Sequence, residues 1–125
     1  MIIHESAEDY LETILRLEEQ QGGQVRSIDI ARALGFSKPS VSVAMKRLRE
    51  NGYVEMAENG NITLLPPGRQ IAQRIYTRHR QLTEFFIALG VSPETAAADA
   101  CKIEHDLSNE TFEKLQQHAG RYLKK

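Results

Sequence analysis

The turn-forming residues between residues 22 and 67 of this 125-residue chain limit its fold more than any other feature. They are Gly22-Gly23, Gly35, Gly52, Asn59-Gly60 and Pro66-Pro67. The segments between them have room only for two short helices and two short strands. Before them, residues 5–21 have apolar residues at helical spacing and acids in the first turns, so this segment is predicted to be a helix that ends at Gly22-Gly23.

The segment after Gly23 predicts a pair of short helices and then a hairpin. Ser27 is a candidate N-cap for the first short helix, and Ser37 is a candidate N-cap for the second. Two β-prone runs, residues 53–56 and 62–65, flank Asn59-Gly60, which is a strong hairpin signal. The order helix, helix, helix, hairpin is that of a winged helix-turn-helix.

Three more helices are predicted after Pro66-Pro67, over about residues 68–89, 93–105 and 109–123. Ser108 is the candidate cap of the last one. The predicted fold class is therefore mainly α.

Charge is segregated along the chain although the net charge is only −1. Residues 24–50 hold six basic and two acidic residues, a local net of +4, whereas residues 4–21 hold six acids and one arginine. A basic middle between acidic flanks indicates a polyanion partner for the middle and cations for the flanks. No apolar run is long enough to cross a membrane, no signal peptide is read, and the single Cys101 fits a reducing cytoplasm.

The helix predicted after Ser37 has two different faces. Val41, Met45 and Leu48 share one face and are predicted to be buried. The other face carries hydroxyls, cations and one small apolar side chain, a combination that suits the DNA major groove. The predicted DNA-contacting residues are Ser37, Lys38, Pro39, Ser40, Ser42, Val43, Lys46 and Arg47.

A second set of chemically active side chains lies near the end of the fifth predicted helix. Cys101, Glu104 and His105 are spaced i, i+3 and i+4, so we expect them on one helical face. An apolar face is expected on the other side, formed by Ala96, Ala100, Ile103 and Leu107. The helix thus has a predicted packing side and a separate side rich in metal donors.

Two other helices carry possible partners for these donors. Asp9 and Glu12 are i, i+3 on the first helix, and His79 lies on the long helix. The six side chains together offer two nitrogen, three carboxylate and one sulfur donor, enough for one or two divalent transition metal ions. Singly, each also fits an ordinary role, as a solvated helix start, a core histidine or a small buried cysteine.

Four blocks of the sequence resemble a known family: "AEDYLETILRLEE", "IARALGFSKPSVSVAMKRLRENGYV", "LLPPGRQIAQRIYTRHRQL" and "CKIEHDLS". The chain resembles the metal-dependent repressors of the diphtheria toxin repressor and manganese transport regulator family, in the short form without an SH3-like domain. The resemblance covers about residues 6–123. It implies a winged helix-turn-helix DNA-binding domain over residues 1–70 and a helical metal-binding and dimerisation domain over residues 71–125.

The resemblance also implies a function and a set of ligands. It implies a cytoplasmic homodimer that binds a palindromic operator and represses metal-uptake genes when Mn²⁺ or Fe²⁺ is plentiful, with Co²⁺ or Zn²⁺ able to substitute in vitro. By position in the family, the metal ligands are Asp9, Glu12, His79, Cys101, Glu104 and His105.

The chain mixes features of the two branches of that family. Cys101 falls where the manganese branch has glutamate and the iron branch has cysteine, whereas Asp9 falls where the iron branch has methionine. Ala97 and Thr83 stand where the iron branch has the histidine and glutamate of an ancillary site. The resemblance therefore makes the chain a hybrid of the two branches and does not favour an iron-type ancillary site, and it leaves open whether each subunit holds one ion or two.

Three other functions are compatible with parts of the pattern. One is a winged-helix regulator controlled by an organic effector, and a second is a metal-binding protein without regulatory coupling. A third is a small two-metal hydrolase, although no catalytic motif is present and a basic recognition helix would then have no role.

Overall fold

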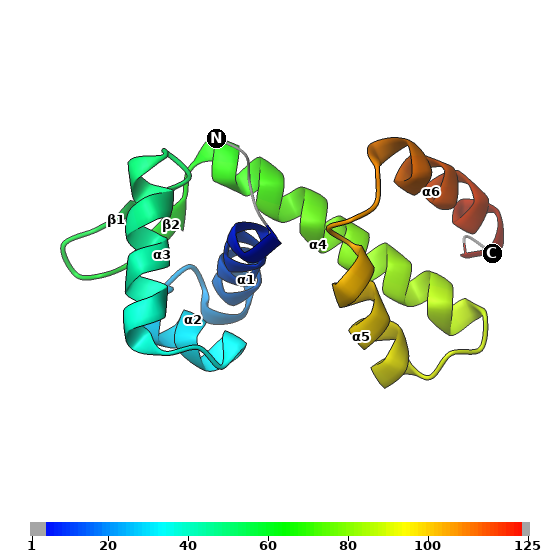
Figure 1. Cartoon of the computed structure of the whole chain (residues 1–125), viewed down its shortest axis with the longest axis horizontal. Helices are drawn as coiled ribbons and strands as arrows, with labels where there is room; N and C mark the ends of the chain where they lie inside the picture. The colour runs from blue at the N-terminus through cyan, green and yellow to red at the C-terminus, as the bar shows by residue number, and fades with distance from the viewer. Residues whose placement is uncertain (1–4, 124–125) are drawn as a thin grey trace. The chain divides into compact units, whose positions relative to one another are not determined.

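The computed structural model describes residues 5–123, with the side chains of residues 6–118, and residues 1–4 and 124–125 of the two predicted domains lie outside it. The chain forms six helices and one two-stranded sheet within this range (Figure 1). The elements are α1 (Glu5–Gln21), α2 (Ser27–Leu34), α3 (Lys38–Glu50), β1 (Val54–Met56), β2 (Ile62–Leu64), α4 (Pro66–Ala88), α5 (Pro93–Ile103) and α6 (Asn109–Leu123). They divide into two compact units, one up to Arg74 and one from Ile75 onward. The mainly α class predicted from the sequence is confirmed.

The first unit is a winged helix-turn-helix. Helix α1 packs against α2 and β2, and α3 packs against α2 and β1. The strands pair antiparallel, with Glu55 opposite Thr63 at the centre of the register. Fully buried core side chains come from all of these elements and from the loop after α1, and they include Leu11, Ile14, Val25, Ile30, Val41, Met45, Val54 and Ile62.

The caps of the short helices differ in part from the prediction. Ser37 caps α3 as expected, because its side chain accepts a hydrogen bond from the Ser40 backbone. The prediction of Ser27 as the cap of α2 is wrong: Arg26 occupies the cap position, and its N–H donates to the Asp29 carboxylate at 2.9 Å. Asp29 reaches back from the first turn and satisfies this backbone donor, which leaves Ser27 as the first helical residue.

A single backbone bond and one side chain tie the hairpin to the loop after α1. Ile62 N–H donates to the Val25 carbonyl at 2.7 Å, and Val25 N–H donates to Asn61 Oδ1 at 2.9 Å. Gly60, with φ of +88°, makes the turn that the Asn59-Gly60 pair predicts. The wing is therefore held where its returning strand begins, next to the turn.

Helix α4 starts two residues earlier than predicted, because the two prolines form its first turn instead of preceding it. Proline is tolerated there, since backbone N–H groups of the first turn have no partner within the helix. Gly68 follows and lies against Tyr53, the residue before β1, so closely that a Cβ atom would overlap the Tyr53 carbonyl oxygen. That same oxygen accepts a hydrogen bond from Leu65 N–H at 3.0 Å, which fixes it in place.

The second unit has its own small core. Leu82 of α4, Ala100 of α5 and Phe112 of α6 are buried together. Phe86, Ile103, Leu107 and Leu115 pack around them. Ser108 caps α6 as predicted, accepting from Thr111 N–H at 3.1 Å. The fifth helix, however, ends at Ile103 and not near His105.

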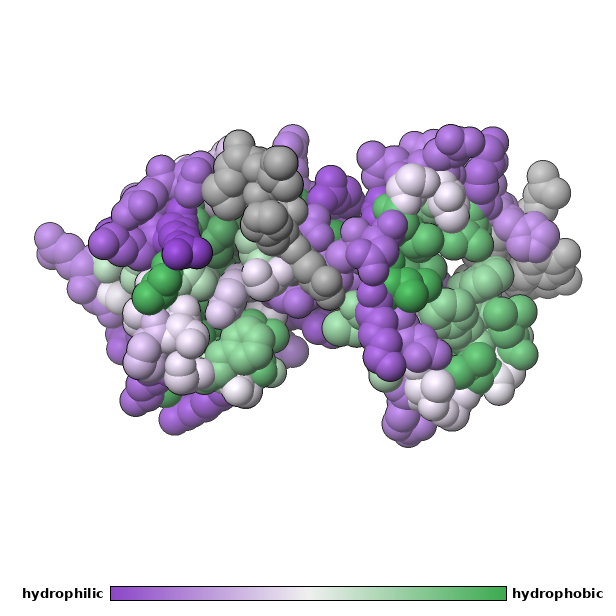
Figure 2. Space-filling model, viewed as in Figure 1, coloured by the Kyte–Doolittle hydropathy of each residue, from purple (hydrophilic) through white to green (hydrophobic). Residues whose placement is uncertain are grey.

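Some apolar surface of the second unit remains exposed. Ile87 and Leu89 are 42% and 67% exposed, at the end of α4 and just after it. Figure 2 shows green apolar surface on the face of this unit that is in view. Among the described residues, no helix has both the length and the apolar character needed to cross a membrane.

The contact at Gly68 gives a test of the first unit. We expect Gly68→Ala to lower its free energy of unfolding by about 1–3 kcal/mol, because the new methyl group meets a backbone carbonyl that cannot turn away. This loss exceeds the gain of roughly 1 kcal/mol that alanine normally gives over glycine inside a helix. Urea unfolding followed by circular dichroism measures it. Gln70→Ala, at an exposed site on the same helix, is the control, and a Gly68→Ala variant as stable as wild type would contradict the packing described.

Candidate metal centre and nucleic-acid interface

Helix α3 has the two faces that the sequence predicts. Val41, Met45 and Leu48 are buried against the first unit. The predicted DNA-contacting residues that lie within α3 are all exposed: Lys38, Pro39, Ser40, Ser42, Val43, Lys46 and Arg47. Val43, the apolar member of this face, is 53% exposed. An exposed basic face with one small apolar side chain is the composition that base edges and phosphates require.

The wing is acidic, whereas the exposed face of α3 is basic. Its strands and turn, residues 51–65, contain Glu55 and Glu58 and neither lysine nor arginine. Both glutamates are exposed. The turn and strand pattern predicts the wing, and its lack of basic residues can also be read from the sequence. Phosphates attract cations, so the wing itself adds no favourable charge to DNA binding.

In the second unit, the Glu104 carboxylate lies between two imidazoles. Its Oε2 is 2.9 Å from His79 Nδ1, and its Oε1 is 3.4 Å from His105 Nε2. The Glu104 side chain is completely buried, and those of His79 and His105 are 13% and 2% exposed. Three of the six predicted ligands are thus brought together, two as ring nitrogens and one as a carboxylate.

This cluster fits a divalent transition metal ion. Within the part of the chain that the structure describes, Glu104 Oε1 accepts no hydrogen bond. A buried carboxylate oxygen without a donor is costly, and a cation at that oxygen would remove the cost. Imidazole and carboxylate are also the ligands that such ions share, and three donors leave positions for others.

Glu104 lies one helical turn after Ala100, and its N–H still donates to the Ala100 carbonyl. The expectation that Glu104 lies on a donor face opposite the apolar face is wrong. Glu104 is the C-cap of α5 and is buried together with Ala100, the preceding residue on the apolar side. Cys101, predicted to share a face with Glu104, is exposed. The structure therefore gathers His79, Glu104 and His105 but leaves Cys101 on the surface of this unit.

The other two predicted ligands lie on α1, in the first unit. Asp9 is half-buried and Glu12 is buried, with a Glu12 carboxylate oxygen 3.9 Å from the Arg16 guanidinium. Tyr10 lies between them in the sequence, and its burial raises the pKa of its hydroxyl. Two ion pairs hold the two ends of α1 to α4: Glu8 with Arg74 at 2.8 Å and Glu18 with Arg69 at 3.0 Å.

One residue beside the cluster was missed in the sequence. Arg78 precedes His79 and is buried, 4% exposed. Its guanidinium donates to the backbone carbonyls of Glu104 and Leu107 and to the side chain of Asn109. A signal was present, because position 78 falls between the apolar Ile75 and Leu82 at core spacing, where an arginine is unexpected.

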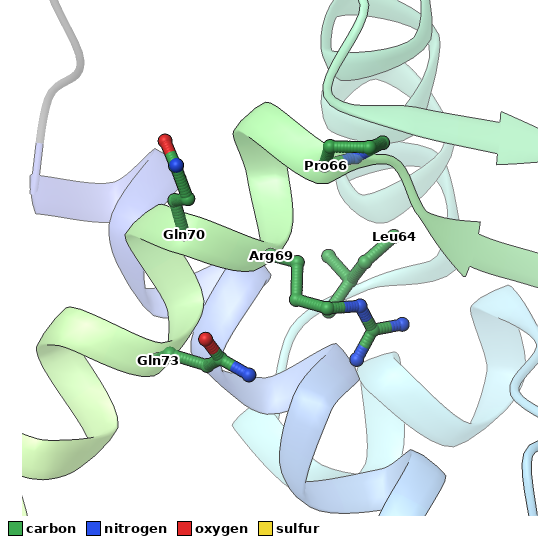
Figure 3. Close-up of a pocket in the computed structure, with 5 residues that line it drawn as sticks. All are labelled: Leu64, Pro66, Arg69, Gln70 and Gln73. Carbon is green, nitrogen blue, oxygen red and sulfur yellow. The ribbon is translucent and has the colours of Figure 1, made fainter.

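A surface pocket of about 320 Å³ lies in the first unit, at the start of α4. Leu64 comes from the end of β2 and the other lining residues come from α4: Pro66, Arg69, Gln70 and Gln73 (Figure 3). Arg69 is already paired with Glu18. None of the predicted metal ligands lines this pocket, so it is separate from the donor cluster.

A winged helix with a basic recognition helix, followed by a helical unit with a carboxylate–imidazole cluster, defines the class of metal-responsive DNA-binding regulators. Residues 3–62 match the N-terminal DNA-binding domain of iron dependent repressors, and residues 66–124 match their metal binding and dimerisation domain. The chain belongs to the iron dependent repressor family, which confirms the resemblance seen in the sequence.

Relatives of known sequence and structure agree with this membership. The transcriptional regulator MntR of Salmonella typhimurium is 38% identical over 118 residues, which are 91% of this chain and 74% of that protein. A manganese-dependent transcriptional repressor in complex with manganese superposes with a TM-score of 0.83 at 29% identity, over 91% of this chain and 52% of that one. IdeR of T. acidophilum superposes with a TM-score of 0.79 at 27% identity, over 96% of this chain and 55% of that one. The chain thus spans about half the length of both solved repressors.

The donor cluster is tested by a change that keeps its shape. We expect Glu104→Gln to weaken Mn²⁺ and Co²⁺ binding by more than about 100-fold, beyond the loss typical of residues that only orient a ligand. Isothermal titration measures the affinity, and thermal unfolding with and without Mn²⁺ gives an independent measure. Glu94→Gln, at an exposed acid of α5, is the control. Metal binding by Glu104→Gln as tight as that of wild type would contradict the assignment.

Proposed function

We propose that the chain is a cytoplasmic, metal-dependent transcriptional repressor that binds a palindromic operator as a homodimer and represses genes for metal uptake. The observation that carries this proposal is the buried Glu104 carboxylate between the His79 and His105 imidazoles, in a chain whose α3 exposes a basic face. Relatives named as manganese-dependent repressor and MntR support it.

The proposed metal ligands are His79, Glu104 and His105, together with three residues assigned only by their family positions. These three are Asp9, Glu12 and Cys101. A bound divalent cation supplies positive charge that neutralises the carboxylates. Glu104 is already directed by its contacts with the two imidazoles, so the donors need little rearrangement to hold an ion.

The proposed metal is Mn²⁺ or Fe²⁺, with Co²⁺ or Zn²⁺ as substitutes in vitro. Carboxylate and imidazole accept all four ions, whereas thiolate favours the softer ones over Mn²⁺. Cys101 is therefore the residue on which the preference among metals depends. Solved relatives with manganese, Zn²⁺ and Cd²⁺ bound support a site of this breadth.

For DNA we propose that α3 enters the major groove. Lys46 and Arg47 contact phosphates or guanine edges, and the exposed Val43 contacts a thymine methyl group. Ser37 and Ser40, at the start of the helix, offer hydroxyls to phosphate. The acidic wing leaves the favourable electrostatic contacts to α3 and its preceding turn.

The regulatory step is proposed to be a change in the position of α1. Asp9 and Glu12 repel one another when both are ionised, and neutralising them stabilises the first helix in its binding arrangement. A dimer that binds two half-sites needs its recognition helices about 34 Å apart. A coupling of about 1–3 kcal/mol between metal and DNA is enough to change operator affinity by several-fold to about a hundredfold.

A dimer is supported by the exposed apolar surface of the second unit. Ile87 and Leu89 are exposed at the end of α4, and contiguous apolar surface of this kind marks interaction sites. We propose that a second copy of the chain covers it.

Operator binding with different metals tests the proposed regulation. We expect fluorescence anisotropy to show that the chain binds operator DNA at least several-fold more tightly with Mn²⁺ or Fe²⁺ than with chelator. This is the effect of a coupling of about 1–3 kcal/mol between metal binding and DNA binding. Glu104→Ala and His105→Ala are expected to abolish this difference. If they leave regulation intact, an organic effector is favoured instead. Equal affinity in chelator and in every metal would rule out metal control.

The charge of the wing makes a separate prediction about DNA. The double variant Glu55→Gln, Glu58→Gln is expected to bind operator and unrelated DNA several-fold more tightly at about 50 mM salt, with the gain shrinking at about 200 mM. Anisotropy titrations across this salt range measure it. Glu94→Gln, in the second unit, serves as the matched control. Unchanged affinity at every salt concentration would show that the wing lies away from the phosphates.

A further inference from the structure

Two neighbouring residues of α4 contact two different parts of Glu104. His79 contacts the Glu104 carboxylate at 2.9 Å, while Arg78 Nη1 donates to the Glu104 backbone carbonyl at 3.0 Å. The backbone and the side chain of the same residue are therefore held from one helix. Holding both restricts the direction in which the carboxylate points.

Arg78 also organises the turn that follows. Its Nη1 donates to the Leu107 carbonyl at 2.7 Å, and its Nη2 donates to Asn109 Oδ1 at 2.6 Å. These acceptors belong to the turn between α5 and α6 and to the first residue of α6. The last carbonyls of a helix have no partner within it, so Arg78 supplies the donors that the end of α5 lacks.

The Arg78 guanidinium donates to two peptide carbonyls and one side-chain amide oxygen. Its guanidinium also lies over the Phe112 ring, 5.1 Å from the centroid. Burying a charge is costly, and an apolar residue at this position would cost less. The arginine guanidinium is a rigid, planar fork with several N–H donors. Neither an apolar residue nor lysine offers this arrangement.

We propose that Arg78 is a positioning residue for the metal centre. It fixes the backbone at Glu104, so that the carboxylate meets the ion in one orientation, and through Asn109 it joins the centre to the start of α6. This role rests on the proposed metal-binding function and deepens it. Arg78 itself does not touch the ion.

Variants of Arg78 and Asn109 test this role with Co²⁺ as the probe, because its visible absorption reports ligand number and geometry. Arg78→Lys keeps the charge but loses the fork, so we expect Co²⁺ affinity to fall by about 10- to 100-fold and the absorption bands to move. Asn109→Ala is expected to lower affinity by a few-fold. Asn109→Asp keeps an acceptor for Arg78, and it is expected to bind Co²⁺ within about twofold of wild type.

Controls separate positioning from stability. Arg80→Lys changes an arginine on the same helix whose guanidinium lies over the Tyr76 ring, 5.5 Å from its centroid, and it is expected to leave Co²⁺ binding unchanged. Thermal unfolding in chelator measures the stability of each variant without metal. A purely structural role would lower the unfolding temperature while the folded protein kept wild-type Co²⁺ affinity and spectrum.

The outcomes distinguish this inference from the proposed function. If wild type binds no Co²⁺, Mn²⁺ or Fe²⁺, the proposed function fails. If wild type binds Co²⁺ and Arg78→Lys binds it with the same affinity and spectrum, the positioning role is overturned. If Arg78→Lys does not fold, the two Asn109 variants test the positioning role. Equal Co²⁺ binding by Asn109→Ala and Asn109→Asp would overturn it.

Discussion

A completely buried carboxylate must be surrounded by groups that compensate its charge, and the second unit is arranged around this requirement at Glu104. Two imidazoles face the carboxylate, and the guanidinium of Arg78 holds the backbone to which it belongs. The apolar core of this unit is small, with Leu82 and Phe112 among its few buried members. Polar contacts therefore carry much of the order in the unit, and order at the carboxylate is what a metal ligand needs.

One helix supplies side chains to both units. Helix α4 begins with two exposed prolines and the glycine that lies against Tyr53, continues with the arginines that pair with α1, and then presents Arg78 and His79. The ion pairs of Glu8 and Glu18 attach α1 to the first half of this helix. The candidate ligands of α1, Asp9 and Glu12, thus lie on a helix that these pairs attach to the first half of α4.

Much of the fold could be predicted because its determinants are local: Ser37 caps its own helix, and Asn59-Gly60 makes its own turn. The end of α5 could not, because Arg78 satisfies the carbonyl at Glu104 from 26 positions away. Glu104 N–H still donates to the Ala100 carbonyl, so Glu104 lies one turn after Ala100 on the buried side, while Cys101 is exposed. Residue types and spacing identified the donors, but which donors meet depended on tertiary structure.

The negative charge of the wing also bears on the rate at which the protein leaves DNA. Attraction to phosphate is independent of sequence, so it sets how long a regulator stays on chromosomal DNA that is not its target. A wing with Glu55, Glu58 and no cation adds nothing to this attraction, and weaker attraction means shorter stays. More molecules then remain in solution, where they equilibrate with the cellular metal pool, and the search for the operator consists of many brief encounters. Fast exchange of this kind lets the state of the gene follow the supply of metal closely.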